Sequence, residues 1–478
     1  MNKEISRRNF LKYMVGGTAA AAASSTLLTA CKRSASGSLA GGSSASAMTT
    51  RTNPNTGDVV SLLGYGMMRL PMLPEGTAPD PQTGPFDQEM INRQVDFALA
   101  HGVNYFDTSP AYCRGLSERC TGIALSRHNR KDYFIATKLS NFGPDTWTTE
   151  ASQDMFENSL KELQTPYIDY LLLHGIGMSG QDSNGNDLNG WQTFEARYMN
   201  NGILDWLVEQ KQVGRIRNLG FSYHGDVKVF DRLLEWHDEG RYHWDFVQIE
   251  LNYLDWFYAN EINWRNTDAV YLYHELEKRG IPAVIMEPLL GGRLAKVNDD
   301  IAAEMKQQDP EASIASWAFR FAGTPEDVLT VLSGMTYMEH LTENIATYSP
   351  LKPISKEEHE FLIHIAGLIY GMQTIPCNEC QYCMPCPYGL DIPAIFSHYN
   401  KCIKEGNTPQ SSGAPGYRKQ RRAFLVGYDR SVPRLRQADH CIGCGQCAPH
   451  CPQQIEIPKE LNRISDYVET LRREGGPI

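Results

Sequence analysis

The stretch Cys441-Ile-Gly-Cys444-Gly-Gln-Cys447-Ala-Pro-His-Cys451-Pro452 decides the fold of the C-terminal part of this 478-residue chain. Its C-x2-C-x2-C-x3-C-P spacing lets the first three thiolates wrap one iron–sulfur cubane from a tight loop, while the fourth reaches a second cubane. The proline that follows stops the loop from continuing as a helix. The spacing therefore predicts [4Fe–4S] binding.

A similar run lies upstream, at Cys377-Asn-Glu-Cys380-Gln-Tyr-Cys383-Met-Pro-Cys386-Pro387. It has two residues rather than three before its last cysteine, so Cys386 fits the pattern less well. Zinc and disulfides are the alternatives, but zinc sites usually take two C-x2-C pairs rather than two runs of four. We therefore predict two [4Fe–4S] clusters with ligands shared between the runs. One set is Cys377, Cys380, Cys383 and Cys451, and the other is Cys386, Cys441, Cys444 and Cys447.

The first 30 residues are typical of an export signal. Arg7-Arg8 precede an apolar stretch that ends at Ala30, as in a twin-arginine signal. A transmembrane anchor is the alternative, but the stretch is short and rich in Ala, Gly, Ser and Thr. Its end, Leu28-Thr29-Ala30-Cys31, resembles a lipoprotein processing box. We expect a periplasmic protein that meets the membrane only through a lipid on Cys31.

Composition and charge limit the roles that other parts of the chain can have. A Ser- and Gly-rich segment, residues 31–57, is expected to be a flexible linker. The formal net charge of −11 argues against a general nucleic-acid binder. Segment 401–436 carries nine Lys and Arg residues against two acids. It is either a solvated face or a docking surface for an acidic redox partner.

Between residues 58 and 352, short apolar runs alternate with amphipathic segments. The eight expected strands are 61–64, 104–107, 134–138, 170–174, 218–221, 246–250, 283–287 and 328–333. Helical patterns fall between them, for example at 87–100, 150–163, 226–237 and 270–279. This alternation predicts an α/β fold of the (β/α)8 TIM-barrel type. An open doubly wound sheet is the alternative, but Gly64-Tyr-Gly66-Met-Met-Arg69 does not complete its G-x-G-x-x-G fingerprint.

One region after the barrel and one connection within it complete the expected organisation. Residues 353–478 are expected to form a helical and ferredoxin-type domain that begins with a helix at 356–372. The polar connection 175–199, after the fourth strand, is either an active-site lid or a solvated insertion.

Four polar residues stand at or just beyond the ends of expected strands, which all point to one rim of a barrel. Asp107, Lys138 and His174 close three strands, and Tyr112 follows Asp107 by five residues. A neighbouring ammonium lowers the pKa of a phenol, and an aspartate can hold that ammonium in place. A histidine can hydrogen-bond a substrate oxygen. The set suits proton delivery to a carbonyl, although each residue alone is more often structural.

In this order and spacing, residues 58–350 resemble the aldo/keto reductase family. The matching motifs are Asp107-Thr-Ser-Pro-Ala-Tyr112 with Ser117-Glu118, Thr137-Lys138, Leu173-His174, Gly214-Arg-Ile-Arg217 before Gly220-Phe-Ser222, Gln248 with Asn252-Tyr253, Pro288-Leu-Leu-Gly291, and Glu343-Asn344. The resemblance implies a catalytic tetrad of Asp107, Tyr112, Lys138 and His174, with Tyr112 as the general acid. It also implies nicotinamide-cofactor contacts at Ser222, Gln248, Pro288, Leu289, Gly291, Glu343 and Asn344.

The implied cofactor pocket departs from the family pattern. Tyr223 replaces the Asn that pairs with Ser222, and Met286 replaces the tyrosine that stacks on the nicotinamide ring. Gly334 and His340 stand where the family places a Lys and an Arg for the 2′-phosphate. Losing two cationic partners weakens the case for NADP over NAD and leaves open whether either is used. A flavin, which converts between one-electron and hydride transfer, is not excluded.

Together these features predict an exported oxidoreductase for a small carbonyl or alcohol, with electrons passing through two clusters to an unidentified redox partner. The alternatives are an electron-transfer or redox-assembly protein that uses the barrel as a scaffold, and a redox sensor. All four tetrad residues are present, which favours the enzyme.

Overall fold

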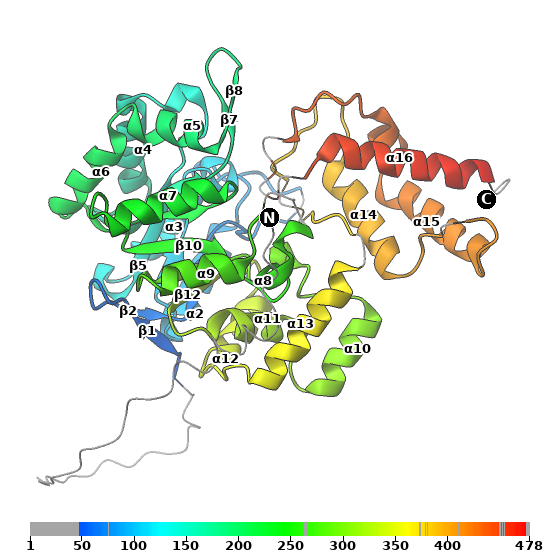
Figure 1. Ribbon diagram of the computed structural model, residues 1–478, viewed down its shortest axis with the longest axis horizontal. Helices are drawn as coiled ribbons and strands as arrows, with labels where there is room; N and C mark the ends of the chain where they lie inside the picture. The colour runs from blue at the N-terminus through cyan, green and yellow to red at the C-terminus, as the bar shows by residue number, and fades with distance from the viewer. Residues whose placement is uncertain are drawn as a thin grey trace, which may run out of the picture. The chain divides into compact units, whose positions relative to one another are not determined.

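A computed structural model describes residues 47–474, except 75, 262–265, 372–373, 378, 380, 410, 449–450, 452 and 454 (Figure 1). The twin-arginine pair, Cys31 and Cys380 lie outside the described residues. Within the described part of the chain, no helix is both long and apolar enough to cross a membrane.

Eight parallel strands close into a barrel, in chain order around the ring. They are β3 (Leu63–Gly66), β4 (Tyr105–Asp107), β5 (Phe134–Leu139), β6 (Ile168–Ile176), β9 (Ile216–Tyr223), β10 (Phe246–Glu250), β11 (Ala283–Met286) and β12 (Val328–Ser333). Strand β12 pairs with β3 to complete the ring, with Val331 opposite Leu63. The predicted (β/α)8 barrel is confirmed, and each of its eight strands overlaps an expected one.

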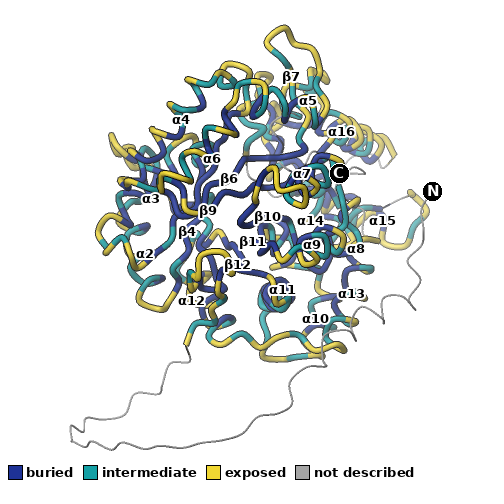
Figure 2. Tube along the Cα trace, turned by 60° about the vertical axis from the view of Figure 1, so that its left-hand side comes forward, coloured by how far each residue is buried: buried dark blue, intermediate teal, exposed yellow. Residues whose placement is uncertain are grey.

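Helices surround the strands, and Figure 2 shows the buried strands at the centre with exposed helix faces outside. They include α2 (Gln88–Ala100), α3 (Ser117–Leu125), α4 (Thr149–Glu162), α6 (Ile203–Gln212), α7 (Val227–Asp238), α9 (Ala269–Glu277), α11 (Ile314–Gly323) and α12 (Met338–Thr347). Helix α7 shows why these segments form helices that bury one face against the strands. Asp226 caps its first turn by accepting from the Lys228 amide, and residues such as Phe230, Leu233 and Leu234 form its buried stripe.

A layer of aromatic and aliphatic side chains makes one buried core cluster from the barrel strands. Tyr170 of β6 lies at its centre, with ring centroids 5.0 Å from Tyr105 and 5.1 Å from Phe246. Side chains alternate along a strand, so the residues two and four positions further on point to the same side. Asp107, Lys138, His174, Ser222 and Gln248 are therefore carried on the inner side of the barrel, beyond this layer.

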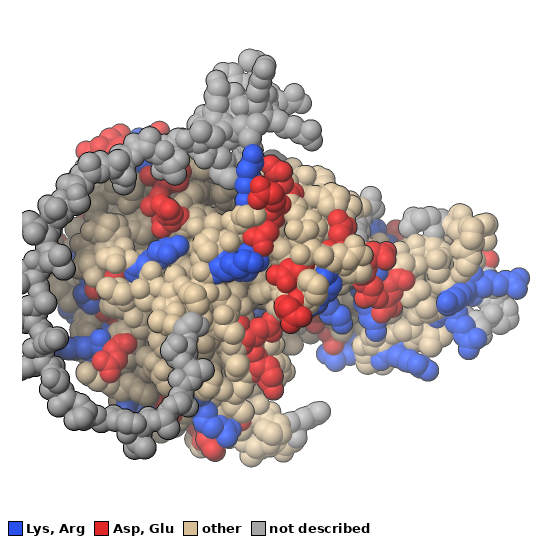
Figure 3. Space-filling model, turned by 90° about the horizontal axis from the view of Figure 1, so that it is seen from below, with Lys and Arg blue, Asp and Glu red and all other residues tan. Residues whose placement is uncertain are grey.

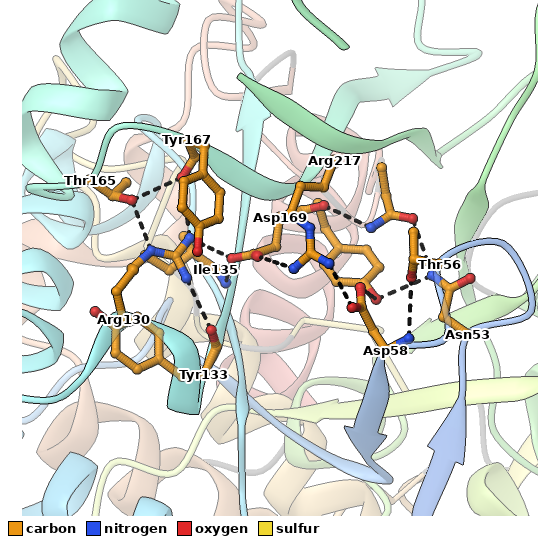
Figure 4. A network of polar contacts seen from close by, with 12 residues as sticks. Asn53, Thr56, Asp58, Arg130, Tyr133, Ile135, Thr165, Tyr167, Asp169 and Arg217 are labelled. Atoms are coloured by element: carbon orange, nitrogen blue, oxygen red, sulfur yellow. Dashed lines mark hydrogen bonds and ion pairs between the residues drawn. The ribbon is translucent and has the colours of Figure 1, made fainter. Parts of the chain in front are cut away.

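Charged groups link neighbouring strands through Asp169, a buried residue of β6 (Figure 4). Its carboxylate accepts from the guanidinium of Arg130 at 2.5 Å and from that of Arg217 at 3.1 Å, and also from the Ile135 amide at 2.8 Å. Arg217 continues to Asp58 at 2.8 Å. A buried carboxylate is tolerated only when it is paired in this way, so the network holds β5, β6 and β9 in register.

The predicted linker, residues 31–57, is wrong in its last part. Strand β1 (Thr50–Thr52) pairs antiparallel with β2 (Val59–Ser61), and the Thr49 amide donates to Tyr348 O. Asn53 is fully buried and donates to Tyr170 Oη at 3.2 Å. The polar composition concealed this hairpin because its stability comes from pairing and long-range hydrogen bonds. The predicted first strand, 61–64, also spans the end of β2 and the start of β3.

The predicted domain boundary at residue 353 is also wrong. Helix α13 (Lys356–Tyr370) buries Leu362, Ile365 and Ile369 in the main core that packs around the barrel strands. Glu358 on this helix pairs with Arg320 of α11 at 2.7 Å. The helix therefore completes the barrel rather than opening the next domain.

The C-terminal domain has a separate core between three helices. These are α14 (Ile392–Lys404), α15 (Tyr417–Ser431) and α16 (Ile457–Glu474), drawn in yellow-orange to red in Figure 1. The two cysteine runs flank α14 and α15 in sequence. Several of their cysteines pack against this core, and Cys451 belongs to it.

The 175–199 connection is partly ordered into short elements. Strands β7 (Gly180–Gln181) and β8 (Asp187–Leu188) form a hairpin, and α5 (Gly190–Phe194) leads into a π-helical turn at Glu195–Met199. Because Arg197 and Tyr198 of that turn are buried, the connection returns to the barrel instead of remaining in solvent.

Candidate active site

Asp107 and Lys138 form a buried ion pair between the ends of β4 and β5. Lys138 Nζ donates to the two Asp107 carboxylate oxygens at 2.7 and 2.8 Å, and to Thr108 O at 2.8 Å. Lys138 is 1% exposed and Asp107 2% exposed, so each charge depends on the other. Burial lowers the pKa of Lys138 and raises that of Asp107, while the partner opposes both shifts.

Tyr112 lies beside this pair. Lys138 Nζ is 4.8 Å from the centroid of the Tyr112 ring, and the His174 ring meets it edge-on at 6.0 Å. Cys113 and Arg114, which follow Tyr112, both have left-handed backbone angles with φ of 53° and 56°. Non-glycine residues adopt such angles at an energetic cost, and these angles turn the chain just after the phenol.

The pKa of Tyr112 departs from the sequence-based expectation. Burial raises it well above its ordinary value, and the negative charges of Asp107, Tyr382 and Glu287 raise it further. The expected lowering by the ammonium is outweighed, because burial and the Asp107 carboxylate that pairs with Lys138 both raise the pKa of Tyr112. Tyr112 is therefore a protonated phenol at neutral pH, which suits a proton donor.

His174 completes the group from the inner side of β6. Its Nδ1 lies 2.6 Å from Ser140 Oγ, and that hydroxyl lies 2.8 Å from Ser109 Oγ. Burial and the nearby Lys138 charge lower the pKa of His174 well below its ordinary value. A neutral imidazole therefore faces the tetrad.

Arg197 is a further residue of the site that the sequence did not reveal. Its guanidinium donates to His174 O at 2.6 Å and lies 5.0 Å from the centroid of the Phe142 ring. Phe142 in turn packs 4.8 Å from the His174 ring. Ser109, Ser140 and Arg197 together fix the histidine, and only the folded chain brings them together.

The residues assigned to a cofactor lie at the ends of β9 to β12 or in the segments that follow. Ser222 Oγ accepts from the Gly175 amide at 2.9 Å, and Gln248 Nε2 lies 3.3 Å from Met286 Sδ. Asn344 Nδ2 donates to Ser333 Oγ at 3.0 Å, while Glu343 is exposed. Pro288 is buried and Leu289 partly buried. The Gly291 amide donates to the Glu287 carboxylate.

The described cysteines of the two runs fall into two sets. Cys377, Cys383 and Cys451 line one cavity with apolar side chains such as Ile392 and Phe396. Burial, with smaller contributions from Cys441, Cys444 and Cys386, raises the pKa of the Cys447 thiol to about 11. Each group includes cysteines from both runs, as the predicted sharing of ligands requires. Among the described residues, no three or more of these side chains are arranged to hold a metal ion.

The other described cysteines have packing roles. Cys113 Sγ lies 3.3 Å from Met68 O, and Cys120 is fully buried. Cys402 Sγ lies 3.4 Å from His398 Nε2 inside the helical core.

Residues 62–364 match the family model described as the aldo/keto reductase family. The chain belongs to the aldo/keto reductase family. Residues 376–456 match the 4Fe-4S dicluster domain. This aldo/keto reductase is therefore an oxidoreductase with a C-terminal iron–sulfur domain.

Among curated relatives, L-galactose dehydrogenase of Arabidopsis thaliana is 25% identical over 338 residues, which cover 67% of this chain and 94% of the relative. An iron–sulfur component of the CoB–CoM heterodisulfide reductase of Methanopyrus kandleri is 33% identical over 90 residues, covering 19% of this chain and 12% of the relative. Among solved structures, an aldo-keto reductase from Bacillus halodurans is 22% identical, with a TM-score of 0.49 and coverage of 66% of this chain and 96% of that chain.

Proposed function

We propose that this aldo/keto reductase is exported and interconverts a small carbonyl compound and its alcohol at Tyr112, with electrons passing through the two clusters of its C-terminal domain. A [4Fe–4S] cluster supplies one-electron transfer when bound. Reduction of the carbonyl group adds hydride to its carbon and a proton to its oxygen. A flavin, which converts single electrons and a proton from solvent into hydride, would supply the first when bound, and the Tyr112 hydroxyl supplies the second. The neutral His174 imidazole orients that oxygen.

The observation that carries the proposal is the hydrogen bonding between the loop that follows β11 and the segments around the first cysteine run. Arg293 donates to Thr374 Oγ1 at 2.9 Å, and Lys404 Nζ donates to Lys296 O at 3.2 Å. A cluster-binding run thus adjoins the substrate side of the barrel.

A polyhydroxylated carbonyl, such as an aldose, is the substrate class that we favour. A small cavity on the rim is lined by His224, Glu250 and Asn266 from the barrel and by Gln453 from the C-terminal domain. Side chains of this kind can hydrogen-bond several hydroxyl groups. The names of two relatives, L-galactose dehydrogenase and D-arabinose 1-dehydrogenase, are consistent with this class.

An anaerobic assay with a panel of aldoses and small aldehydes tests the function. We expect chemically reduced methyl viologen to support reduction of at least one compound, because that dye delivers single electrons. NADH or NADPH alone should not support it. Equal rates with NADPH in protein stripped of iron would contradict a route through the clusters.

The redox partner is proposed to dock on the basic segment 401–436. Lys and Arg side chains are visible on the C-terminal part of the chain, at the right of Figure 3. Arg421 is buried and donates to Leu471 O, so it supports the fold, whereas Arg418, Arg422 and Arg430 are exposed. Exposed cations of this kind favour an acidic partner.

Export is proposed from the signal sequence and has its own test. Replacing Arg7 and Arg8 by lysine should leave the precursor in the cytoplasm, because the pair is the expected export address. Cys31→Ala should block lipid attachment but not the fold. Cell fractionation with mass analysis of the N-terminus reads both outcomes. A cytoplasmic wild-type protein that still carries Met1 would refute the proposed location.

A further inference from the structure

Glu287 stands at the point where the cofactor of an aldo/keto reductase would approach the tetrad. It follows β11 directly and has a left-handed φ of 53°. This strained angle directs its carboxylate to the Gly291 amide, which donates to it. The family resemblance assigns Gly291 to the nicotinamide cofactor. In this chain the Gly291 amide already donates to the carboxylate of Glu287.

The charge around Glu287 is unfavourable for a dinucleotide. Burial and the neighbouring Glu250 raise the pKa of Glu287, while Arg69, the Gly291 amide and His224 lower it. Glu250 itself lies 3.4 Å from His224 Nδ1. A dinucleotide brings a pyrophosphate and thus further negative charge into this region.

The expected ring pocket is also filled by internal contacts. Gln248 Nε2 lies against Met286 Sδ at 3.3 Å, and Gln248 Oε1 is buried without a hydrogen-bond partner among the described residues. Tyr223, at the position of the family's Asn, donates its hydroxyl to Gly225 O. Gln248 retains one acceptor for a carboxamide, but the sequence supplies neither the companion Asn nor the stacking tyrosine.

We infer that the barrel does not bind NAD(P), because the Glu287 carboxylate takes the backbone donor of the cofactor loop, the Gly291 amide. The residues present therefore do not fit the cofactor that the family implies. The inference deepens the proposed function, since it removes the soluble hydride donor and leaves the C-terminal domain as the route for electrons. It concerns equilibrium binding and can be tested without a substrate.

The test is a titration of the anaerobically purified full chain with NADPH and with NADH, followed by isothermal calorimetry. For the wild type we expect no saturable binding up to about 1 mM of either nucleotide. Glu287→Ala frees the Gly291 amide and removes the charge, so it should bind at least about tenfold more tightly. Glu287→Gln removes the charge but keeps an oxygen that can accept from the Gly291 amide. Comparing it with Glu287→Ala therefore separates the effect of the charge from the effect of the blocked amide.

Asp182→Asn is the matched control, because it removes a partly exposed carboxylate from the turn of the β7–β8 hairpin without touching this loop. It should behave as the wild type. A one-to-one wild-type complex in the micromolar range would overturn the inference, as would Glu287 variants that bind no better than Asp182→Asn. The nucleotide titration does not measure proton donation by Tyr112 or turnover driven by methyl viologen. A failure of this inference is therefore distinguishable from a failure of the proposed function.

Discussion

Replacing Tyr112 by phenylalanine is expected to lower turnover by roughly 10²–10⁴-fold, the range typical for loss of a general acid. The substitution removes only the hydroxyl. The ring can keep its place 4.8 Å from Lys138 Nζ and 6.0 Å from the His174 ring. Because the aromatic contacts remain, the variant should fold, and the loss should appear in kcat more than in KM.

The pH dependence of turnover tests the protonation state of Tyr112. The pKa of Tyr112 is raised well above its ordinary value, so the phenol stays protonated through the neutral range. Activity in the reductive direction should therefore not decline between about pH 6 and 9 through loss of this proton.

Tyr337→Phe, at an exposed tyrosine of the chain, is the control for Tyr112→Phe and should leave turnover unchanged. A Tyr112→Phe enzyme within about twofold of the wild type would refute the assignment.

Removing one cysteine of either set is expected to halve the iron content, from about eight to about four atoms per chain. Cys451→Ala should empty the site that Cys377 and Cys383 line, because these three cysteines share one cavity. Cys447→Ala should empty the other site, where Cys386, Cys441 and Cys444 lie near it. Iron and sulfide analysis of anaerobically purified protein measures both.

A double variant distinguishes shared ligands from ligands kept within one run. With shared sets, Cys377→Ala combined with Cys451→Ala removes two ligands from one cluster and should retain about four irons. If each run held its own cluster, the same double variant would lose both. Cys402→Ala is the control, since this buried thiol contacts His398 within the helical core and should retain all the iron.

Strong periodic signals explain what could be predicted of the fold. The barrel strands are apolar runs whose burial determines them, so their positions followed from the sequence to within a few residues. Strand β1 and helix α13 were misassigned because tertiary contacts, not composition, decide them. The β1 strand is polar and depends on pairing with β2. Helix α13 follows an apparent boundary but packs back onto the barrel core.

The candidate site was predictable where a residue type coincided with a strand end. Asp107, Lys138 and His174 met that condition, and the two mixed sets of cysteine ligands stay a prediction from their spacing. Arg197 and Ser140 did not meet it, because their contacts with His174 arise only when the chain folds and the 175–199 connection returns to the rim. The sequence marked Met286 as a departure from the family. That the Glu287 carboxylate bonds to the Gly291 amide required the structure.

The most direct measurement follows the electrons of the C-terminal domain during one turnover. The holoprotein is reduced with dithionite, freed of excess reductant and mixed with an aldose or aldehyde that the viologen assay has identified. Electron paramagnetic resonance then records the signal of the reduced clusters. We predict that the signal falls as alcohol forms in the wild type, and that it persists in Tyr112→Phe. A wild-type signal that persists while added NADPH drives the same reduction would contradict the account.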